Sequence, residues 1–142
     1  MLANHYFGSS ALLCVDDDAI VRLYLSKLLE SEYLQIIEAE NGKTALDVLQ
    51  ENNNIQYIVL DLDMPMMNGY EFLDYVNKIE NKWNWNIFVH STESESYFFN
   101  QLTSRGISPG IIYGYYKKNI DTRLMVYSIL NKLNRSLLEK VA

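Results

Sequence analysis

Carboxylates follow two short apolar runs of the chain. They are Asp16, Asp17 and Asp18 after the run 11–15, and Asp61 and Asp63 after the run 57–60. Carboxylates that gather in one place repel one another and raise each other's pKa unless a cation compensates their charge. Mg²⁺ suits such a set because it prefers oxygen ligands and commonly combines few carboxylates with water and a phosphate oxygen. These residue types therefore predict a magnesium site that handles phosphate, provided that the two runs end at the same place.

A hydroxyl group and an ammonium group follow two later apolar runs. The residues are Ser91 and Thr92 after the run 87–90, and Lys117 and Lys118 after the run 111–116. Acidic residues after strands can also serve only to cap the helices that follow. Capping accounts for Asp18, but it gives no role to Asp16, Asp17 and Asp61 beside a lysine. We therefore favour the interpretation that these residues form a functional site and do not only cap helices.

The apolar runs alternate along the chain with longer segments of helical period. We expect strands at residues 11–15, 34–39, 57–60, 87–90 and 111–116. Wholly apolar runs of this length are typical of parallel strands that are covered on both faces. Strands that alternate with helices in this way predict a doubly wound α/β sheet. In such a sheet ligands bind beyond the carboxyl ends of the strands, which is where the carboxylates, the hydroxyl group and the ammonium group stand.

Apolar side chains at helical spacing predict the sides of the helices. On the first helix, which Asp17 or Asp18 can cap, one side is marked by Ile20, Leu23, Lys27 and Leu28. Later helices are expected from residue 42, over residues 70–79 and 94–102, and from about residue 121 to the end. The last of these carries one stripe made of Val126, Leu130, Leu133 and Leu137.

Size and composition limit the classes of function. A chain of 142 residues has room for one domain with a sizeable core. Its net charge of -6, without a dense basic run, argues against nucleic-acid binding. No apolar stretch approaches the ~20 residues of a membrane span, and the first ten residues do not resemble a signal peptide. A single cysteine, Cys14, excludes an intramolecular disulfide and agrees with a cytoplasmic location.

The motifs resemble those of response-regulator receiver domains. The segment 12–18 (LLCVDDD) is similar to the acidic pair that closes their first strand, and the segment 58–69 (IVLDLDMPMMNG) is similar to their phosphoacceptor strand and loop. The intervals agree as well: 61 − 17 = 44 residues from acidic pair to acceptor, and 91 − 61 = 30 from acceptor to hydroxyl. The resemblance runs from about residue 11 to residue 132. It implies a flavodoxin-like (βα)5 sheet in the order 2-1-3-4-5, with residues 1–10 as an N-terminal extension and residues 11–142 as a stand-alone, chemotaxis-type receiver domain.

The resemblance also implies how the acceptor would work. Asp61 would be the nucleophile that takes a phosphoryl group from a histidine kinase or a histidine phosphotransfer protein. Asp17, Asp61 and the backbone carbonyl of Asp63 would bind Mg²⁺ directly, and Asp16 would act mainly through a bound water. The domain would signal to a downstream protein and would not be an enzyme beyond its own phosphorylation and dephosphorylation.

Three further residues receive roles from the resemblance. Lys118 would pair with a phosphoryl oxygen. Ser91 would turn its hydroxyl toward the same group, and Tyr115 would then rotate inward as part of a conformational switch. Strand alternation allows only one of two adjacent lysines to face the site. We choose Lys118 and expect Lys117 to face the solvent.

Some positions depart from the family pattern. Asn119 stands where the family usually has a proline after a cis bond, which would cost ~2.5–4 kcal/mol before a non-proline residue, so either the strain is kept or the loop differs. Thr92 replaces a small residue that usually leaves the acceptor accessible. The interval from Ser91 to Tyr115, 115 − 91 = 24 residues, is longer than usual.

Three rival functions share parts of this pattern, and the third of them fails. A phosphohydrolase of the haloacid-dehalogenase type would use Asp61 and Asp63, but it would leave the first acidic pair without a purpose. A pseudo-receiver would bind partners without phosphorylation, and Asn119 and Thr92 are its best support. A calcium loop over residues 61–69 lacks the further ligands and the final Glu of such loops.

Overall fold

A computed structural model of the chain describes residues 10–80 and 84–141. Its centre is one parallel sheet with the strand order β2-β1-β3-β4-β5. The strands are β1 (Ser10–Val15), β2 (Leu34–Ala39), β3 (Ile55–Leu60), β4 (Asn86–Ser91) and β5 (Ile112–Lys117). This topology confirms the predicted doubly wound α/β fold and the predicted strand order.

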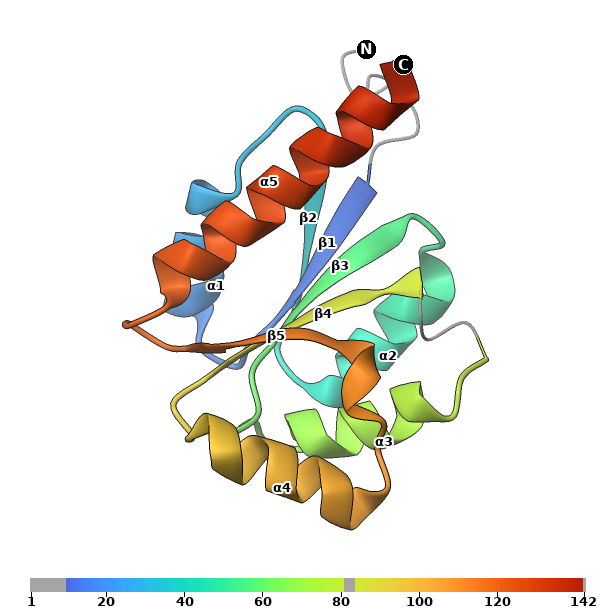
Figure 1. The fold of residues 1–142 in the computed structure, drawn as a ribbon, viewed down its shortest axis with the longest axis vertical. Coiled ribbons are helices and arrows are strands. Elements are labelled where there is room, and N and C mark those ends of the chain that lie inside the picture. Colours follow the sequence, from blue (N-terminus) through green and yellow to red (C-terminus); the bar gives the residue numbers. More distant parts are fainter. Residues whose placement is uncertain (1–9, 81–83, 142) are drawn as a thin grey trace.

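Helices cover both faces of the sheet. They are α1 (Ala19–Leu28), α2 (Gly42–Glu51), α3 (Gly69–Asn77), α4 (Glu95–Arg105) and α5 (Thr122–Val141), and a short 3₁₀ turn, η3 (Pro109–Ile111), precedes β5. Helices α1 and α5 lie on one face, and α2, α3 and α4 lie on the other (Figure 1). Within the described part of the chain, no helix is both long and apolar enough to cross a membrane.

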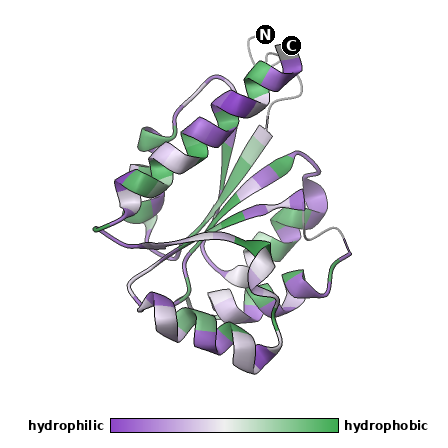
Figure 2. Cartoon of the chain, viewed as in Figure 1, coloured by the Kyte–Doolittle hydropathy of each residue, from purple (hydrophilic) through white to green (hydrophobic). Residues whose placement is uncertain are grey.

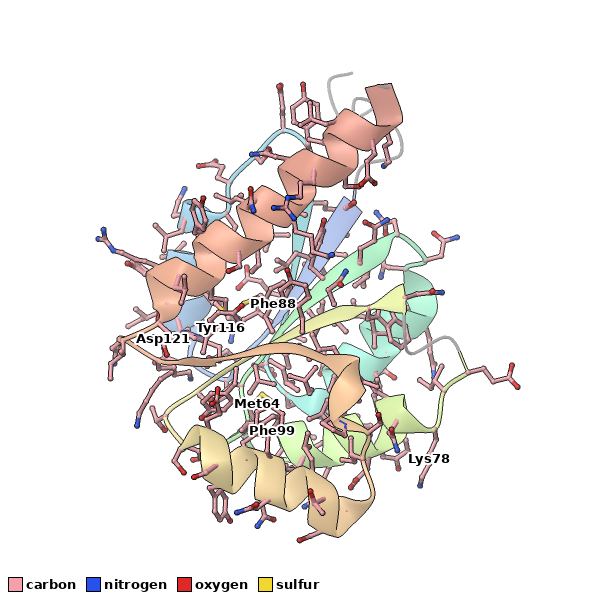
Figure 3. The ribbon with its side chains drawn as sticks, in the orientation of Figure 1. Met64, Lys78, Phe88, Phe99, Tyr116 and Asp121 are labelled. Atoms are coloured by element: carbon pink, nitrogen blue, oxygen red, sulfur yellow. The ribbon has the colours of Figure 1, made fainter. Side chains whose placement is uncertain are left out.

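The strands are apolar because each face of the sheet has its own core. One core lies against α2, α3 and α4 and includes Leu13, Ile58 and Phe98, and the other lies against α1 and α5 and includes Phe88 and Ile129. The hydrophobic colouring of the central strands follows from this double covering (Figure 2). Figure 3 shows the two layers through single residues: Phe88 and Tyr116 lie on the side of α5, and Met64 lies on the opposite side together with Phe99, which belongs to α4.

Polar residues begin the helices where the sequence places them. Side-chain oxygens of Asp18, Asn41, Asn68 and Ser94 each accept a hydrogen bond from a backbone N–H in the first turn of α1, α2, α3 and α4. Asn68 and Glu71 form a reciprocal capping box. The caps start α1, α2 and α4 within four residues of the preceding strand, whereas a longer loop that begins with Asp61 separates β3 from α3.

The side of α1 that faces the sheet differs from the expectation at Ile20 and Leu23 and agrees with it at Leu28. Ile20 and Leu23 are exposed, whereas Leu25 is fully buried and Val21 and Leu28 pack against the core. The helix carries two apolar stripes, one through residues 20, 23 and 24 and one through residues 21, 25 and 28, and both fit a period of 3.6 residues. The packing of α1 against the sheet selects the second stripe.

Candidate functional site

Three carboxylates gather beyond the ends of β1 and β3. One oxygen atom from each of Asp16, Asp17 and Asp61 lies within 4.8 Å of the others. Asp16 and Asp61 are buried, and Asp17 is exposed. The adjacent pairing of β1 and β3, with Val15 opposite Leu60, brings the residues that follow both strands together. Because all three groups are hard oxygen donors, the cluster could hold a divalent cation such as Mg²⁺.

Backbone contacts fix Asp16 in place. The Arg22 guanidinium donates a hydrogen bond of 2.7 Å to the Asp16 carbonyl, and it also forms an ion pair of 2.9 Å with Glu38. The Asp16 carboxylate accepts the Asp18 backbone N–H at 2.9 Å through Oδ1. The other oxygen, Oδ2, therefore remains for the centre of the site.

Asp61 is a buried carboxylate whose pKa is raised. It is only 4% exposed, and its Oδ1 accepts the backbone N–H of Leu62 at 2.9 Å. Burial and then the charge of Asp16 raise the pKa of Asp61 to about 6, although Lys118 and the Leu62 N–H act in the opposite direction. A carboxylate with a raised pKa is a stronger base and nucleophile than an ordinary aspartate, and it gains from any cation that approaches.

Lys118 lies at the centre of the acidic cluster. Its Nζ is 2.8 Å from Oδ2 of Asp16 and 3.2 Å from Oδ1 of Asp61. Burial alone lowers the pKa of Lys118, but the hydrogen bond to Asp16 and the charges of Asp61 and Asp16 raise it above its usual value. Of the two adjacent lysines, it is Lys118 that reaches the cluster, and the four ion pairs found in the described chain include none from Lys117.

Ser91 and Tyr115 meet at the loop that follows β4. Ser91 is buried, and its hydroxyl accepts the backbone N–H of Glu93 at 3.1 Å. The Tyr115 hydroxyl donates to the backbone carbonyl of the same Glu93, and its ring lies 5.3 Å from the ring of Phe98. Burial raises the pKa of Tyr115. Both predicted switch residues therefore hold one loop, although no hydrogen bond joins either of them to Asp61 within the described residues.

The loop after Asp61 packs so closely that one position requires glycine. A Cβ added to Gly69 would lie 2.5 Å from the Asp61 carbonyl oxygen and 2.8 Å from the Leu62 Cα. The Gly69 N–H also donates to the Leu62 carbonyl at 3.0 Å. The first turn of α3 thereby supports the backbone of the acceptor strand. The Asp63 side chain is exposed and lies outside the acidic cluster, and the role of its carbonyl stays a prediction.

The sequence left two alternatives for the turn between β5 and α5: a strained cis bond before Asn119, or a loop that differs from the family pattern. No peptide bond in the described residues is cis, so the loop itself differs. Asn119 adopts a left-handed conformation with φ of 67°, which asparagine tolerates better than most residues. Thr92, the other departure, is exposed.

Sequence reasoning missed several contacts around the site. Tyr70 donates to the Glu93 carboxylate at 3.2 Å, and Arg22 holds the Asp16 carbonyl. His90, on the opposite face of β4 from Ser91, lies 2.8 Å from the Thr122 hydroxyl through Nε2. Strand alternation alone predicts that His90 faces away from Ser91, but its partner follows 32 residues later and no local pattern indicates it. Of the two tryptophans between α3 and β4, Trp85 packs against the core and Trp83 lies outside the described residues.

Comparison with known proteins points to one family. The model of the response regulator receiver domain matches residues 12–128. The chain is 30% identical to the two-component response regulator ORR5 of Oryza sativa subsp. japonica over 99 residues, which are 70% of this chain and 74% of that protein. It is 42% identical over 72 residues to the transcriptional regulatory protein CpxR homolog of Haemophilus influenzae, which covers 51% of this chain and 31% of that protein.

Solved structures agree in fold. The chemotaxis response regulator CheY4 of Vibrio cholerae matches with a TM-score of 0.69 and 22% identity, covering 88% of this chain and 98% of that one. The receiver domain of a LuxO repressor protein from Vibrio parahaemolyticus matches with a TM-score of 0.72 and 22% identity, covering 94% and 96%. At this identity the likeness concerns the fold alone.

Proposed function

Because this chain belongs to the family of response regulator receiver domains, we propose that Asp61 is the residue that accepts the phosphoryl group. The observation that carries the proposal is the position of Lys118, whose ammonium lies within 3.2 Å of two buried carboxylates. A cation held between two carboxylates is poised to pair with an incoming phosphoryl oxygen. The raised pKa of Asp61 supports the same assignment.

Magnesium fits the carboxylates of this pocket. Asp17 and Asp61 are proposed as direct ligands together with the Asp63 carbonyl, and Asp16, whose Oδ2 already pairs with Lys118, acts mainly through water. When bound, Mg²⁺ offsets the negative charge of the transferring phosphoryl oxygens. The exposure of Asp17 leaves this side of the pocket open to solvent and to an arriving donor.

The transfer is a displacement at phosphorus. An oxygen of the Asp61 carboxylate donates its electron pair to the phosphorus of a phosphohistidine, and the bond from phosphorus to the imidazole nitrogen breaks, leaving its electron pair on that nitrogen. The product is an aspartyl phosphate. Lys118 leaves its ion pair with Asp61 and pairs with a phosphoryl oxygen, so its charge stabilises the group as it arrives.

The proposed switch joins the acceptor to the loop after β4. The Ser91 hydroxyl turns from the Glu93 N–H toward the phosphoryl group, and Tyr115 follows because its hydroxyl binds the Glu93 carbonyl. A charge change at Asp61 thereby biases the surface formed by α4 and β5. The partners on the two sides of this switch are a histidine kinase or phosphotransfer protein and a downstream protein. The limits of the receiver domain at residues 11 and 142, and the cytoplasmic location, stay predictions.

Phosphorylation by a small donor tests the proposal. The protein is incubated with acetyl phosphate with and without Mg²⁺, and its intact mass is measured. We expect the mass of one added phosphoryl group only with Mg²⁺, its removal by hydroxylamine, and no addition in Asp61→Asn. The matched control Asp63→Asn should still be modified. Absence of an adduct with every donor would favour the pseudo-receiver, and release of phosphate from simple phosphomonoesters would favour the hydrolase.

A further inference from the structure

A polar chain connects the buried strand β4 to the turn that carries Lys118. His90 Nε2 lies 2.8 Å from the Thr122 hydroxyl oxygen. The backbone N–H of Asn119, the residue after Lys118, donates to the same hydroxyl at 3.1 Å. Thr122 is the first residue of α5, so one oxygen atom joins a central strand, the turn and a helix.

His90 is the buried and neutral residue at one end of this series of hydrogen bonds. The residue is 3% exposed, and burial, followed by the charge of Lys118, lowers the pKa of His90 to about 4. Its Nδ1 is sealed from solvent and has no hydrogen-bond partner in the described structure. The tautomer with hydrogen on Nε2 is favoured because it leaves Nδ1 as a bare lone pair rather than an unpaired N–H donor. In that tautomer Nε2–H donates to the Thr122 oxygen, which accepts the Asn119 N–H with its second lone pair.

The turn around Lys118 is held at both ends. The Lys118 N–H donates to the Ser91 carbonyl at 2.9 Å, which ties its start to β4. Asn119 follows in the left-handed conformation, and its N–H is the group that binds Thr122. The backbone of Lys118 is thus fixed on one side by the strand and on the other by the Thr122 hydroxyl, which acts together with the hydrogen bonds between Lys117 and Asp121. Without that hydroxyl, nothing described in the structure would hold the N–H of Asn119.

We propose that His90 and Thr122 are positioning residues that aim the Lys118 ammonium at the acceptor pocket. The proposal rests on the proposed role of Lys118, but it concerns how this chain holds the lysine. The Lys118 side chain is long, and ordering it costs conformational entropy. A fixed backbone at Lys118 reduces this cost because fewer positions of the ammonium remain to be excluded. When the turn is fixed, Nζ is delivered to Asp16 and Asp61 at 2.8 and 3.2 Å. When the turn is released, the three carboxylates stay in place and only the cation is lost from the pocket.

The test replaces the Thr122 hydroxyl by a methyl group in the full chain. Thr122→Val keeps the shape of the side chain, Thr122→Ser keeps the hydroxyl, and Thr103→Val removes a distant helical hydroxyl that binds only the Phe99 carbonyl. Calorimetry measures the affinity for Mg²⁺ and, with Mg²⁺ present, for fluoroberyllate, an analogue of the phosphoryl group. Amide and ammonium NMR follows the Lys118 Nζ signal, whose protons exchange slowly with water only while bound to carboxylates.

We expect Thr122→Val to weaken fluoroberyllate binding about tenfold, which corresponds to one hydrogen bond to a charged group. Its Mg²⁺ affinity should stay within about twofold of the original protein, and the Lys118 ammonium signal should disappear. Thr122→Ser and Thr103→Val should behave as the original protein. A Thr122→Val protein that keeps the ammonium signal would overturn the proposal, and so would an equal loss of Mg²⁺ and fluoroberyllate binding. If the original protein binds no fluoroberyllate, the proposed phosphoacceptor function fails, while the ammonium signal still decides the positioning role.

Discussion

The Lys118 ammonium lies 3.2 Å from Oδ1 of Asp61. Lys118 follows β5, which is separated from β3 by β4 in the sheet, so its side chain reaches past the end of β4. The same ammonium pairs with Asp16 at 2.8 Å. One cation therefore compensates two buried carboxylates that would otherwise repel each other. The relationship makes the pocket both sensitive to the loss of Lys118 and receptive to a second cation.

Removing the ammonium should destabilise the protein. In Lys118→Met, Asp16 and Asp61 remain buried without their cation, and we expect the free energy of unfolding to fall by roughly 1–3 kcal/mol at pH 7.5, because a buried charge has lost its partner. Urea denaturation measures this change. Lys117→Met is the matched control and should change the free energy of unfolding little. Equal losses in the two variants would contradict the assignment of Lys118.

Replacing the acceptor should stabilise the protein in a manner that depends on pH. The pKa of Asp61 is about 6 in the folded protein and 3.8 in its ordinary state, so the folded state binds more protons between these values. Stability contributed by this group is present below pH 3.8 and is lost as pH rises through 6. In EDTA, Asp61→Asn should therefore be more stable by up to about 3 kcal/mol at pH 7.5, and this gain should vanish near pH 4. Thermal denaturation of both proteins across this range tests it, and a gain that does not change with pH would contradict it.

His90 should produce the opposite dependence on pH. Its pKa is about 4 in the folded protein and 6.5 in its ordinary state, so the unfolded state binds the extra proton. The stability that the neutral side chain contributes is present above pH 6.5 and is lost as pH falls toward 4. His90→Gln does not titrate, so the difference in unfolding free energy between the original protein and this variant should shrink over that window. A constant difference from pH 7.5 to pH 4.5 would show that His90 is not held neutral.

Met66 should be a site of backbone strain. It adopts φ of 67° while the residue is 78% exposed, so little packing compensates the left-handed conformation. That conformation costs most side chains ~1–2 kcal/mol, and asparagine tolerates it better. We expect Met66→Asn to raise the free energy of unfolding by roughly 0.5–1 kcal/mol. Met67→Asn, at the half-buried neighbour, should lower it, and a loss of stability in Met66→Asn would contradict the strain.

Sequence alone predicts the sheet and the residues at its strand ends. Apolar runs mark strands covered on both faces, and the carboxyl ends of parallel strands share one edge, so Asp16, Asp17, Asp61 and Lys118 could be expected to meet. The strand order and family are confirmed by the fold and the comparisons. The distances between the side chains had to come from the structure.

Three features could not be predicted from the sequence. On α1, the stripes through Ile20 and through Val21 fit the helical period equally well, and only packing selects the second. The bond between His90 and Thr122 joins residues that are 32 positions apart, so it depends on where β4 and α5 meet rather than on local pattern. The left-handed turn at Asn119 is joined to the same contact, because the Asn119 N–H donates to the Thr122 hydroxyl.

The central claim is that Asp61 itself carries the phosphoryl group, and chemical mapping tests it most directly. The protein is phosphorylated with acetyl phosphate and Mg²⁺ and then reduced with borohydride, which converts an aspartyl phosphate to homoserine. Peptide sequencing by mass spectrometry then locates the homoserine. We predict that it replaces Asp61 and no other aspartate. Homoserine at Asp16, Asp17 or Asp63, or none at all in a protein that has gained a phosphoryl group, would contradict the account.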